Sequence, residues 1–170
     1  MSVEIAGLQT SEVEQLCALA RTIWREHYPP IIGEAQTEYM LEQRYTAEIV
    51  RRELESDAIW WDVLKVDREP VAFASSLRLD AFNELKLDKL YVRPDRQRHG
   101  YGGLLIGHTC ARARELGCDT VVLAVNKRNS KAIAAYRKYG FEVREAVVKD
   151  IGSGFVMDDY IMVRRVRTRA

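Results

Sequence analysis

Apolar residues recur along the chain at two spacings, and each spacing predicts a type of element. Between positions 13 and 24 they follow one another at the three- and four-residue steps of a helix. Ser11 and Glu14 have the spacing of a capping box at its start, and the prolines at 29 and 30 would end it. A second helix is predicted over 37–54, and two more over about 101–117 and 129–139. These four helices separate groups of predicted strands.

Strands are predicted where apolar residues alternate with polar ones or form short continuous runs. The predicted ranges are 3–8, 59–66, 71–79, 85–92, 120–125, 141–149 and 155–163. The order is one strand, two helices, three strands, a helix, a strand, a helix and two strands, which predicts an α/β fold with a mixed sheet. The chain has 170 residues and no linker or repeat, so a single domain over 1–170 is expected.

The strand predicted over 85–92 contains a break in its alternation. Leu85 and Leu87 are apolar in one phase, whereas Leu90 and Val92 are apolar in the other. A β-bulge near 88–89 would shift the phase by one residue in this way. A solvent-exposed end of the strand would produce the same pattern, so both explanations stay open.

Composition and charge narrow the possible functions. The 26 Lys and Arg against 25 Asp and Glu leave a formal net charge of +1, which argues against a nucleic-acid binder that relies on bulk charge. No apolar run approaches the roughly 20 residues of a membrane span, and the N-terminus lacks the pattern of a secretion signal. Three cysteines without CxxC spacing, and no histidine pair at metal-ligand spacing, predict a cytoplasmic protein with no metal site.

The stretch from Gln97 to Gly103 carries the clearest chemical signal. It places three glycines between a predicted strand and a predicted helix. Glycines let backbone N–H groups approach a ligand closely, and the first turn of a helix offers N–H groups, so the stretch predicts a pocket for a phosphate or diphosphate. Arg98 and His99 would add charge at its rim. A glycine turn that only joins strand to helix is the alternative.

Two common phosphate motifs do not fit this stretch. A dinucleotide-binding GxGxxG needs a third glycine where Leu105 stands, and no GxxxxGK[ST] run occurs in the chain. The wider pattern resembles the GCN5-related N-acetyltransferases (GNAT) instead. The residues that carry the resemblance are Leu90-Tyr91-Val92-Arg93-Pro94, Gln97-x-x-Gly100-x-Gly102, Asn129, Ala135-Tyr136 and Gly140-Phe141. The resemblance covers about 85–143, and the segments 24–28, 89–92 and 154–160 are similar to the PaiA-like spermidine/spermine acetyltransferase branch.

The resemblance implies a GNAT fold of about seven strands, mixed but mostly antiparallel, with a central parallel β-α-β crossover and about four helices. It implies acetyl-CoA as co-substrate, held by backbone groups of one strand and by the loop that follows, and no metal. The residues implied in binding the cofactor are Leu90, Tyr91, Val92, Gln97, Arg98, His99, Gly100, Tyr101, Gly102, Gly103, Asn129 and Lys138.

Tyr136 matches the family's usual general acid, which would protonate the departing coenzyme A thiolate. Its alternative role is packing, because in a Schellman motif that ends at Gly140 the side chains of Tyr136 and Phe141 commonly pack together. The resemblance assigns no clear general base. Glu84 and Asp88 are candidates, although solvated surface charges, or proton loss to a water chain, explain the same residues.

The acceptor site is expected near the end of the first helix and the final hairpin. Trp24, Tyr28, Glu84 and Asp158 are its candidate residues, with core packing as the alternative for Trp24. The expected reaction is acetylation of a primary amine, such as a polyamine, by direct attack in a ternary complex. A protein acetyltransferase acting on N-termini or lysines, and a non-catalytic acyl-CoA-binding regulatory module, are the alternatives. The expected partners are a small-molecule amine and a second copy in a homodimer, with no nucleic acid or membrane.

Overall fold

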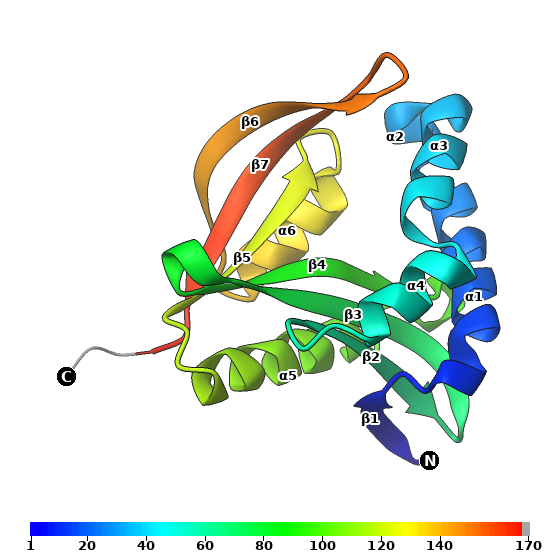
Figure 1. Cartoon of the computed structure of the whole chain (residues 1–170), viewed down its shortest axis with the longest axis vertical. Helices are drawn as coiled ribbons and strands as arrows, with labels where there is room; N and C mark the ends of the chain where they lie inside the picture. Colours follow the sequence, from blue (N-terminus) through cyan, green and yellow to red (C-terminus); the bar gives the residue numbers. More distant parts are fainter. Residues whose placement is uncertain (168–170) are drawn as a thin grey trace. The chain divides into compact units, whose positions relative to one another are not determined.

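The computed structural model describes residues 1–167, and within them seven strands form one sheet in the order β1-β2-β3-β4-β5-β7-β6 (Figure 1). The pairs β1–β2, β2–β3, β5–β7 and β6–β7 are antiparallel, whereas β4–β5 is parallel. Helix α5 lies between β4 and β5 in sequence and provides the crossover that a parallel pair requires. The predicted α/β class, with a mixed and mostly antiparallel sheet, is therefore confirmed.

The element bounds follow the predicted order closely. The strands are β1 Val3–Gly7, β2 Ile59–Val66, β3 Glu69–Leu79, β4 Glu84–Val92, β5 Thr120–Asn126, β6 Glu142–Gly152 and β7 Phe155–Arg165. The helices are α1 Val13–His27, α2 Pro29–Ile32, α3 Glu34–Arg44, α4 Ala47–Leu54, α5 Tyr101–Glu115 and α6 Ser130–Lys138. No helix in residues 1–167 is long and apolar enough to cross a membrane.

The described chain has six α-helices where four were predicted, and local chemistry explains the difference. The prolines at 29 and 30 end α1, but they also occupy the first turn of the short helix α2, where proline is well tolerated. The single helix predicted over 37–54 is wrong, because α3 ends at Arg44. Thr46 then caps a new helix by accepting a hydrogen bond from Ile49 N at 3.3 Å. A 3₁₀ turn over Thr10–Glu12 precedes α1, and there Gln9 N donates to the Glu12 carboxylate at 3.0 Å. This bond takes the place of the capping box predicted for Ser11 and Glu14.

Contacts along the chain group it into two compact units. The first contains Met1–Leu77 and Lys89–Leu105, and the second contains Arg78–Asp88 and the residues from Ile106 on. The boundaries fall inside β3, β4 and α5 and coincide with no linker. The expectation of a single domain over 1–170 stays a prediction.

An aromatic cluster forms the core of the first unit. We use this name for Trp24, Tyr28, Tyr45, Trp61, Phe73 and Tyr91, which come from α1, the segments after α1 and α3, and strands β2, β3 and β4. Trp24 is the central member, with ring centroids 4.2 Å from Tyr28, 5.5 Å from Tyr45 and 5.6 Å from Tyr91. The end of β4 is therefore held against α1 by ring packing.

The break in the alternation of β4 coincides with a buried lysine, and the bulge near 88–89 stays a prediction. Strand β4 runs without interruption from Glu84 to Val92, and Lys89 is buried in phase with Leu85 and Leu87. A buried lysine thus takes the position where alternation calls for an apolar residue. Burial therefore continues in one phase from Leu85 through Lys89.

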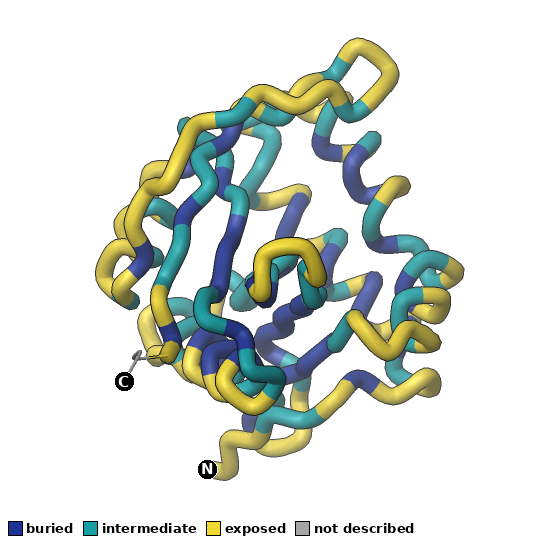
Figure 2. Tube along the Cα trace, turned by 60° about the vertical axis from the view of Figure 1, so that its left-hand side comes forward, coloured by how far each residue is buried: buried dark blue, intermediate teal, exposed yellow. Residues whose placement is uncertain are grey.

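The second unit contains β5, β6, β7 and α6. No residue of β5 is exposed, and Val121, Val122, Leu123 and Val125 are buried, in agreement with its apolar run. Its parallel ladder with β4 covers three residue pairs, Glu84–Lys86 with Thr120–Val122. Strand β6 forms the end of the sheet, and Figure 2 shows the β6–β7 hairpin exposed along most of β6.

Candidate acetyl-CoA and acceptor sites

The predicted phosphate loop lies between β4 and α5 in the first unit. A 3₁₀ turn over Pro94–Arg96 follows the strand, and α5 begins at Tyr101. Gly100 has a φ of +80°, a left-handed conformation that a side chain would strain. Arg98 adopts a φ of +68°, so the chain turns sharply twice before the helix. The glycine signal in the sequence therefore corresponds to a real turn at Gly100.

The amides at the start of α5 are suited to an anion. Leu104 N donates to Gly100 O at 3.1 Å, which makes it the first helical hydrogen bond. The N–H groups of Tyr101, Gly102 and Gly103 precede that bond, and an α-helix leaves such groups outside its own hydrogen bonding. Together with the positive end of the helix dipole, they form the kind of site that binds phosphate groups.

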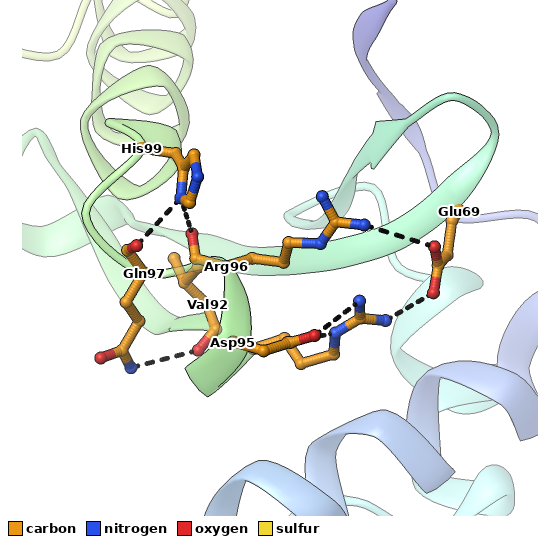
Figure 3. Close-up of polar contacts among 7 residues, drawn as sticks. Glu69, Val92, Asp95, Arg96, Gln97 and His99 are labelled. Carbon is orange, nitrogen blue, oxygen red and sulfur yellow. Dashed lines mark hydrogen bonds and ion pairs between the residues drawn. The ribbon is translucent and has the colours of Figure 1, made fainter. Parts of the chain in front are cut away.

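Arg93 fixes the loop to the β2–β3 hairpin, and Figure 3 labels its partners Glu69 and Asp95. Its guanidinium donates to Glu69 at 2.7 Å and to Asp95 at 2.6 and 3.1 Å. The hydrogen bonds that Arg93 donates to Asp95 and Glu69 raise the pKa of Arg93. The same bond to Glu69 lowers the pKa of that carboxyl. Arg96 adds a longer ion pair with Glu69 at 3.7 Å. The sequence motif included Arg93, but no sequence pattern indicated its partner.

Two predicted cofactor residues stabilise the loop itself. His99 Nδ1 donates to Gln97 O at 2.9 Å and to Arg96 O at 3.1 Å, and the His99 ring stacks on Tyr101 (Figure 3). Gln97 Nε2 donates to Val92 O at 3.4 Å. These bonds keep the turn closed on the end of β4. Arg98, in contrast, is exposed at the loop surface, where its charge is accessible.

The side chain of Tyr91 belongs to the aromatic cluster. Its hydroxyl lies 2.8 Å from that of Tyr28, and burial raises its pKa well above the usual 10. The Tyr91 phenol therefore stays neutral at physiological pH. Leu90, Tyr91 and Val92 are half-buried, and the ring contacts of Tyr91 orient this segment of β4.

Lys89 is a buried cation that sequence reasoning did not assign to the site. Its ammonium lies 3.8 Å from a Glu53 carboxylate oxygen, 5.0 Å from the Trp61 ring and 5.7 Å from the Tyr45 ring. Trp61 Nε1 donates to the same Glu53 oxygen at 2.9 Å. The Glu53 carboxylate and the two aromatic faces thus help to compensate the ammonium. A lysine in phase with Leu85 and Leu87 is the sequence signal that indicates this arrangement.

Tyr136 occupies the position predicted by the packing alternative. Phe141 N donates to Tyr136 O at 3.0 Å and Gly140 N donates to Arg137 O at 3.1 Å, which together are a Schellman motif with Gly140 at φ +89°. The Tyr136 and Phe141 rings meet edge-on at 5.7 Å. Tyr136 is half-buried, so this packing leaves part of the side chain accessible.

Asn129 and Lys138 lie at opposite ends of α6. The buried Asn129 caps the helix, because its side-chain oxygen accepts a hydrogen bond from Ala132 N at 3.4 Å. Lys138 is exposed in the last turn, where a cation is favourable for the helix dipole.

Glu84 has a structural environment that differs from that of a solvated general base. It is buried, and its carboxylate accepts hydrogen bonds from Thr120 Oγ1 and Arg144 Nη1, each at 2.8 Å. The contacts join the start of β4 to β5 and β6. Asp88, the other candidate, lies 3.6 Å from Lys86. Both carboxylates are therefore engaged with partners on the sheet.

Asp158 pairs with Lys127 at 2.8 Å, and the bond raises the pKa of Lys127. The negative charge of Asp158, a candidate acceptor residue, is thus partly neutralised. The neighbouring Asp159 is buried. The three cysteines are buried, and burial raises the pKa of each thiol, which does not favour thiol catalysis.

The structure brings the predicted residues together in two groups. The first unit contains Trp24, Tyr28, Leu90, Tyr91, Val92 and Gln97–Gly103. The second contains Glu84, Asn129, Tyr136, Lys138 and Asp158. No group of three His, Cys, Asp or Glu residues suited to a metal occurs in residues 1–167.

Comparison with known proteins identifies relatives across nearly the whole chain. A model of the acetyltransferase (GNAT) family matches residues 15–141. Spermidine N(1)-acetyltransferase of Thermoplasma acidophilum is 29% identical over 165 residues, which cover 93% of this chain and 97% of the relative. Peptidyl-lysine N-acetyltransferase YjaB of Escherichia coli is 28% identical over 156 residues, which cover 91% and 93%.

Solved structures share the fold. The PaiA N-acetyltransferase of Thermoplasma acidophilum, crystallised with coenzyme A, superposes with a TM-score of 0.81 at 24% identity and covers 97% of this chain and 99% of its own. The ribosomal-protein-S18-alanine N-acetyltransferase of Escherichia coli superposes with a TM-score of 0.71 at 20% identity, covering 99% and 97%. At these identities the likeness supports the fold alone.

Proposed function

Because the chain belongs to the acetyltransferase (GNAT) family, and is an acetyl-CoA-dependent N-acetyltransferase, we propose that it acetylates a primary amine of a small polyamine. The observation that carries this proposal is the alignment with a spermidine N(1)-acetyltransferase over 93% of the chain. The reaction is direct attack of the amine on the thioester within a ternary complex of enzyme, acetyl-CoA and amine.

Acetyl-CoA binding rests on the amides at the start of α5 and on the end of β4. The N–H groups of Tyr101, Gly102 and Gly103 hold the diphosphate, and the exposed guanidinium of Arg98 adds positive charge at the rim. Backbone groups of Leu90, Tyr91 and Val92 bind the pantetheine arm like an added strand. A backbone N–H of this segment also stabilises the oxyanion that forms on the thioester carbonyl.

Within this proposal, Gln97 and His99 act indirectly. Their hydrogen bonds hold the loop closed, so that the amides keep one geometry. In the second unit, Asn129 contacts the cofactor at the start of α6, and Lys138 binds its distal phosphate. Each of these roles follows the family pattern at the matching residue.

Tyr136 acts as general acid in the last chemical step. The amine nitrogen forms a bond to the acetyl carbon, the carbon–sulfur bond breaks, and the thiolate takes the Tyr136 proton. The attacking nitrogen loses one proton to water, and the Tyr136 phenolate regains one from water. A thiol titrates near 8.5 and a tyrosine near 10, so complete transfer is uphill by roughly 1.5 units, or about 2 kcal/mol. Proton transfer concerted with bond cleavage avoids that cost. The Schellman motif fixes the Tyr136 backbone, which helps to orient the phenol.

The amine loses its proton before attack. At pH 7 an amine of pKa near 10.4 is deprotonated at a cost of about 4.6 kcal/mol. Glu84 is held by Thr120 and Arg144, so we assign proton removal to water rather than to this carboxylate. Trp24 shapes the acceptor region from within the core through its contact with Tyr28, while Tyr28 and Asp158 contact the acceptor.

Acetylation of protein lysines is a second candidate, favoured by the alignment with the peptidyl-lysine N-acetyltransferase over 91% of the chain. A lysine side chain and a polyamine present the same primary ammonium on an alkyl stem. The two candidates differ in what surrounds the amine, so a comparison of kcat/KM between polyamines and lysine peptides distinguishes them.

The test is a measurement of thiol release from acetyl-CoA with spermidine, spermine, free lysine and lysine peptides. We expect saturable release with spermidine and kcat/KM at least about tenfold higher than with any peptide. A preference for peptides would replace the polyamine proposal with the second candidate. Coenzyme A binding without release for any amine would identify a non-catalytic module.

A further inference from the structure

The β2–β3 hairpin presents the Glu69 side chain from a tight turn. Val66 and Glu69 are partners in the ladder, so only two residues connect the strands. These residues, Asp67 and Arg68, have φ values of +49° and +71°, as in the type I′ turn whose twist matches the flanking strands. Ser2 N donates to Asp67 Oδ1 at 2.8 Å, and Asp67 N donates to Ser2 O at 2.9 Å. Glu69 therefore begins a strand whose turn is held by the N-terminal segment.

Arg93 connects this hairpin to the turn that follows β4. Its backbone N–H donates to Val71 O at 2.8 Å, which ties the end of β4 to β3. Its guanidinium donates two bonds to Asp95, at 2.6 and 3.1 Å, and a third bond to Glu69 at 2.7 Å. Bonds between such ions are roughly twice as strong as neutral ones, and the paired bonds to Asp95 fix the plane of the guanidinium. The Arg93 side chain is 23% exposed, so water competes weakly for these bonds.

The turn between Arg93 and α5 depends on support from its surroundings. Arg96 N donates to Arg93 O at 2.8 Å and Gln97 N donates to Pro94 O at 3.4 Å, so the turn starts at Arg93 itself. Arg98 then adopts a φ of +68°, a left-handed conformation that is unfavourable for a residue with a side chain. A strained backbone keeps its shape where the surrounding structure holds it. The Arg93 contacts therefore act on the segment that sets where α5 begins.

We infer that Glu69 is a positioning residue for acetyl-CoA, because through Arg93 it holds this turn in the shape that directs the amides of 101–103 at the diphosphate. The inference rests on the proposed diphosphate site at the start of α5. Amides that are already ordered before binding save the cost of ordering the loop when the cofactor arrives. The negative charge of Glu69 would by itself repel a phosphate group. Its benefit to binding therefore comes from geometry.

The sign of the effect separates positioning from charge. If charge alone mattered, Glu69→Met would remove a repulsive carboxylate, and acetyl-CoA would bind more tightly. Loss of the anchor frees the turn instead, so we expect KM and Kd for acetyl-CoA to rise by about three- to tenfold. The value of kcat and the KM for the amine should each stay within about twofold of the wild type. Glu69→Gln keeps a neutral acceptor and should fall between wild type and Glu69→Met.

A shorter thioester separates an effect on the diphosphate from general damage. S-acetylpantetheine carries the same acetyl group and arm but ends before the diphosphate. Its kcat/KM should change less than about twofold in Glu69→Met, while that for acetyl-CoA falls. Glu38→Met is the matched control, because Glu38 binds Arg25 through bonds of 2.7 and 3.0 Å and is 51% exposed, against 53% for Glu69. It should lose a similar amount of stability and keep its KM for acetyl-CoA.

Arg93→Met tests the path of the effect. On this background Glu69→Met should change KM for acetyl-CoA by less than about 1.5-fold, because the two residues act through one bond. Unchanged or tighter binding by Glu69→Met, an equal loss with S-acetylpantetheine, or a full effect on the Arg93→Met background would each overturn the inference. Equal kcat/KM for the two thioesters in the wild type would overturn the diphosphate site itself, and the inference with it.

Discussion

The buried Lys89–Glu53 pair makes a quantitative prediction about what holds the end of β4 in place. The change is Glu53→Gln, which removes the negative charge but keeps an oxygen to accept the 2.9 Å hydrogen bond from Trp61 Nε1. The Lys89 side chain is 2% exposed and the Glu53 side chain 23%. The variant therefore removes the Glu53 charge from beside a buried ammonium.

The magnitude follows from Coulomb's law and burial. At 3.8 Å and an effective dielectric constant of about 20, the pair interacts by about 4 kcal/mol. Partial exposure of Glu53 reduces this value, and removing an acid from the last turn of α4 returns a few tenths of a kcal/mol. We expect Glu53→Gln to lower the free energy of unfolding by about 1–3 kcal/mol.

Urea denaturation, followed by tryptophan fluorescence, measures this loss, because Trp24 and Trp61 both belong to the aromatic cluster. Lys89→Met is the matched control. It removes the cation and keeps an apolar chain of similar length, so its cost should be below about 1.5 kcal/mol. Glu53→Gln on the Lys89→Met background should cost less than about 0.5 kcal/mol. An equal cost of Glu53→Gln on both backgrounds would refute the electrostatic account of this pair.

Three further predictions concern the chemistry and the loop. Tyr136→Phe should lower kcat by about 10²-fold with an unchanged KM for acetyl-CoA and unchanged stability, and an unchanged kcat would reject the general acid. Glu84→Gln and Arg144→Met should each lower the melting temperature by similar amounts and leave kcat unchanged, because both weaken the same ion pair. A loss of kcat confined to Glu84→Gln would show that Glu84 acts as a base. Arg93 lowers the pKa of Glu69 below 4.5, so this ion pair stabilises the fold above that pH and its contribution is lost as the pH falls through the lowered value. The difference in melting temperature between wild type and Glu69→Gln should therefore shrink in acid, and a constant difference would contradict this explanation.

Much of the fold could be predicted because local signals and the global topology agree. The positions of the strands along the chain follow from alternation and apolar runs. The glycine stretch marks the turn at Gly100 before α5. The Schellman motif after α6 was predictable from the spacing of Tyr136, Gly140 and Phe141. These features depend on residues that are near one another in the sequence.

The features that were missed depend on partners distant in sequence. The alternation of β4 did not indicate that Lys89 is buried, because its partner Glu53 lies on α4. Glu84 was interpreted as a candidate base or a surface charge. In the structure it is buried and binds Arg144, which lies on β6, 60 residues away. The division of the helix over 37–54 depended on a single threonine cap, a signal that apolar spacing does not contain.

Isothermal titration with coenzyme A tests most directly whether the start of α5 holds the diphosphate. The wild type should bind one equivalent with a dissociation constant on the order of 1–100 μM. In Gly102→Asp, a carboxylate at the helix N-terminus favours the helix but repels the diphosphate, so affinity should fall by about 10²-fold or more without a lower melting temperature. Gly102→Asn, which adds a side chain of the same size without charge, should lose less. Absence of heat with the wild type, or binding by Gly102→Asp as tight as that of the wild type, would contradict this assignment.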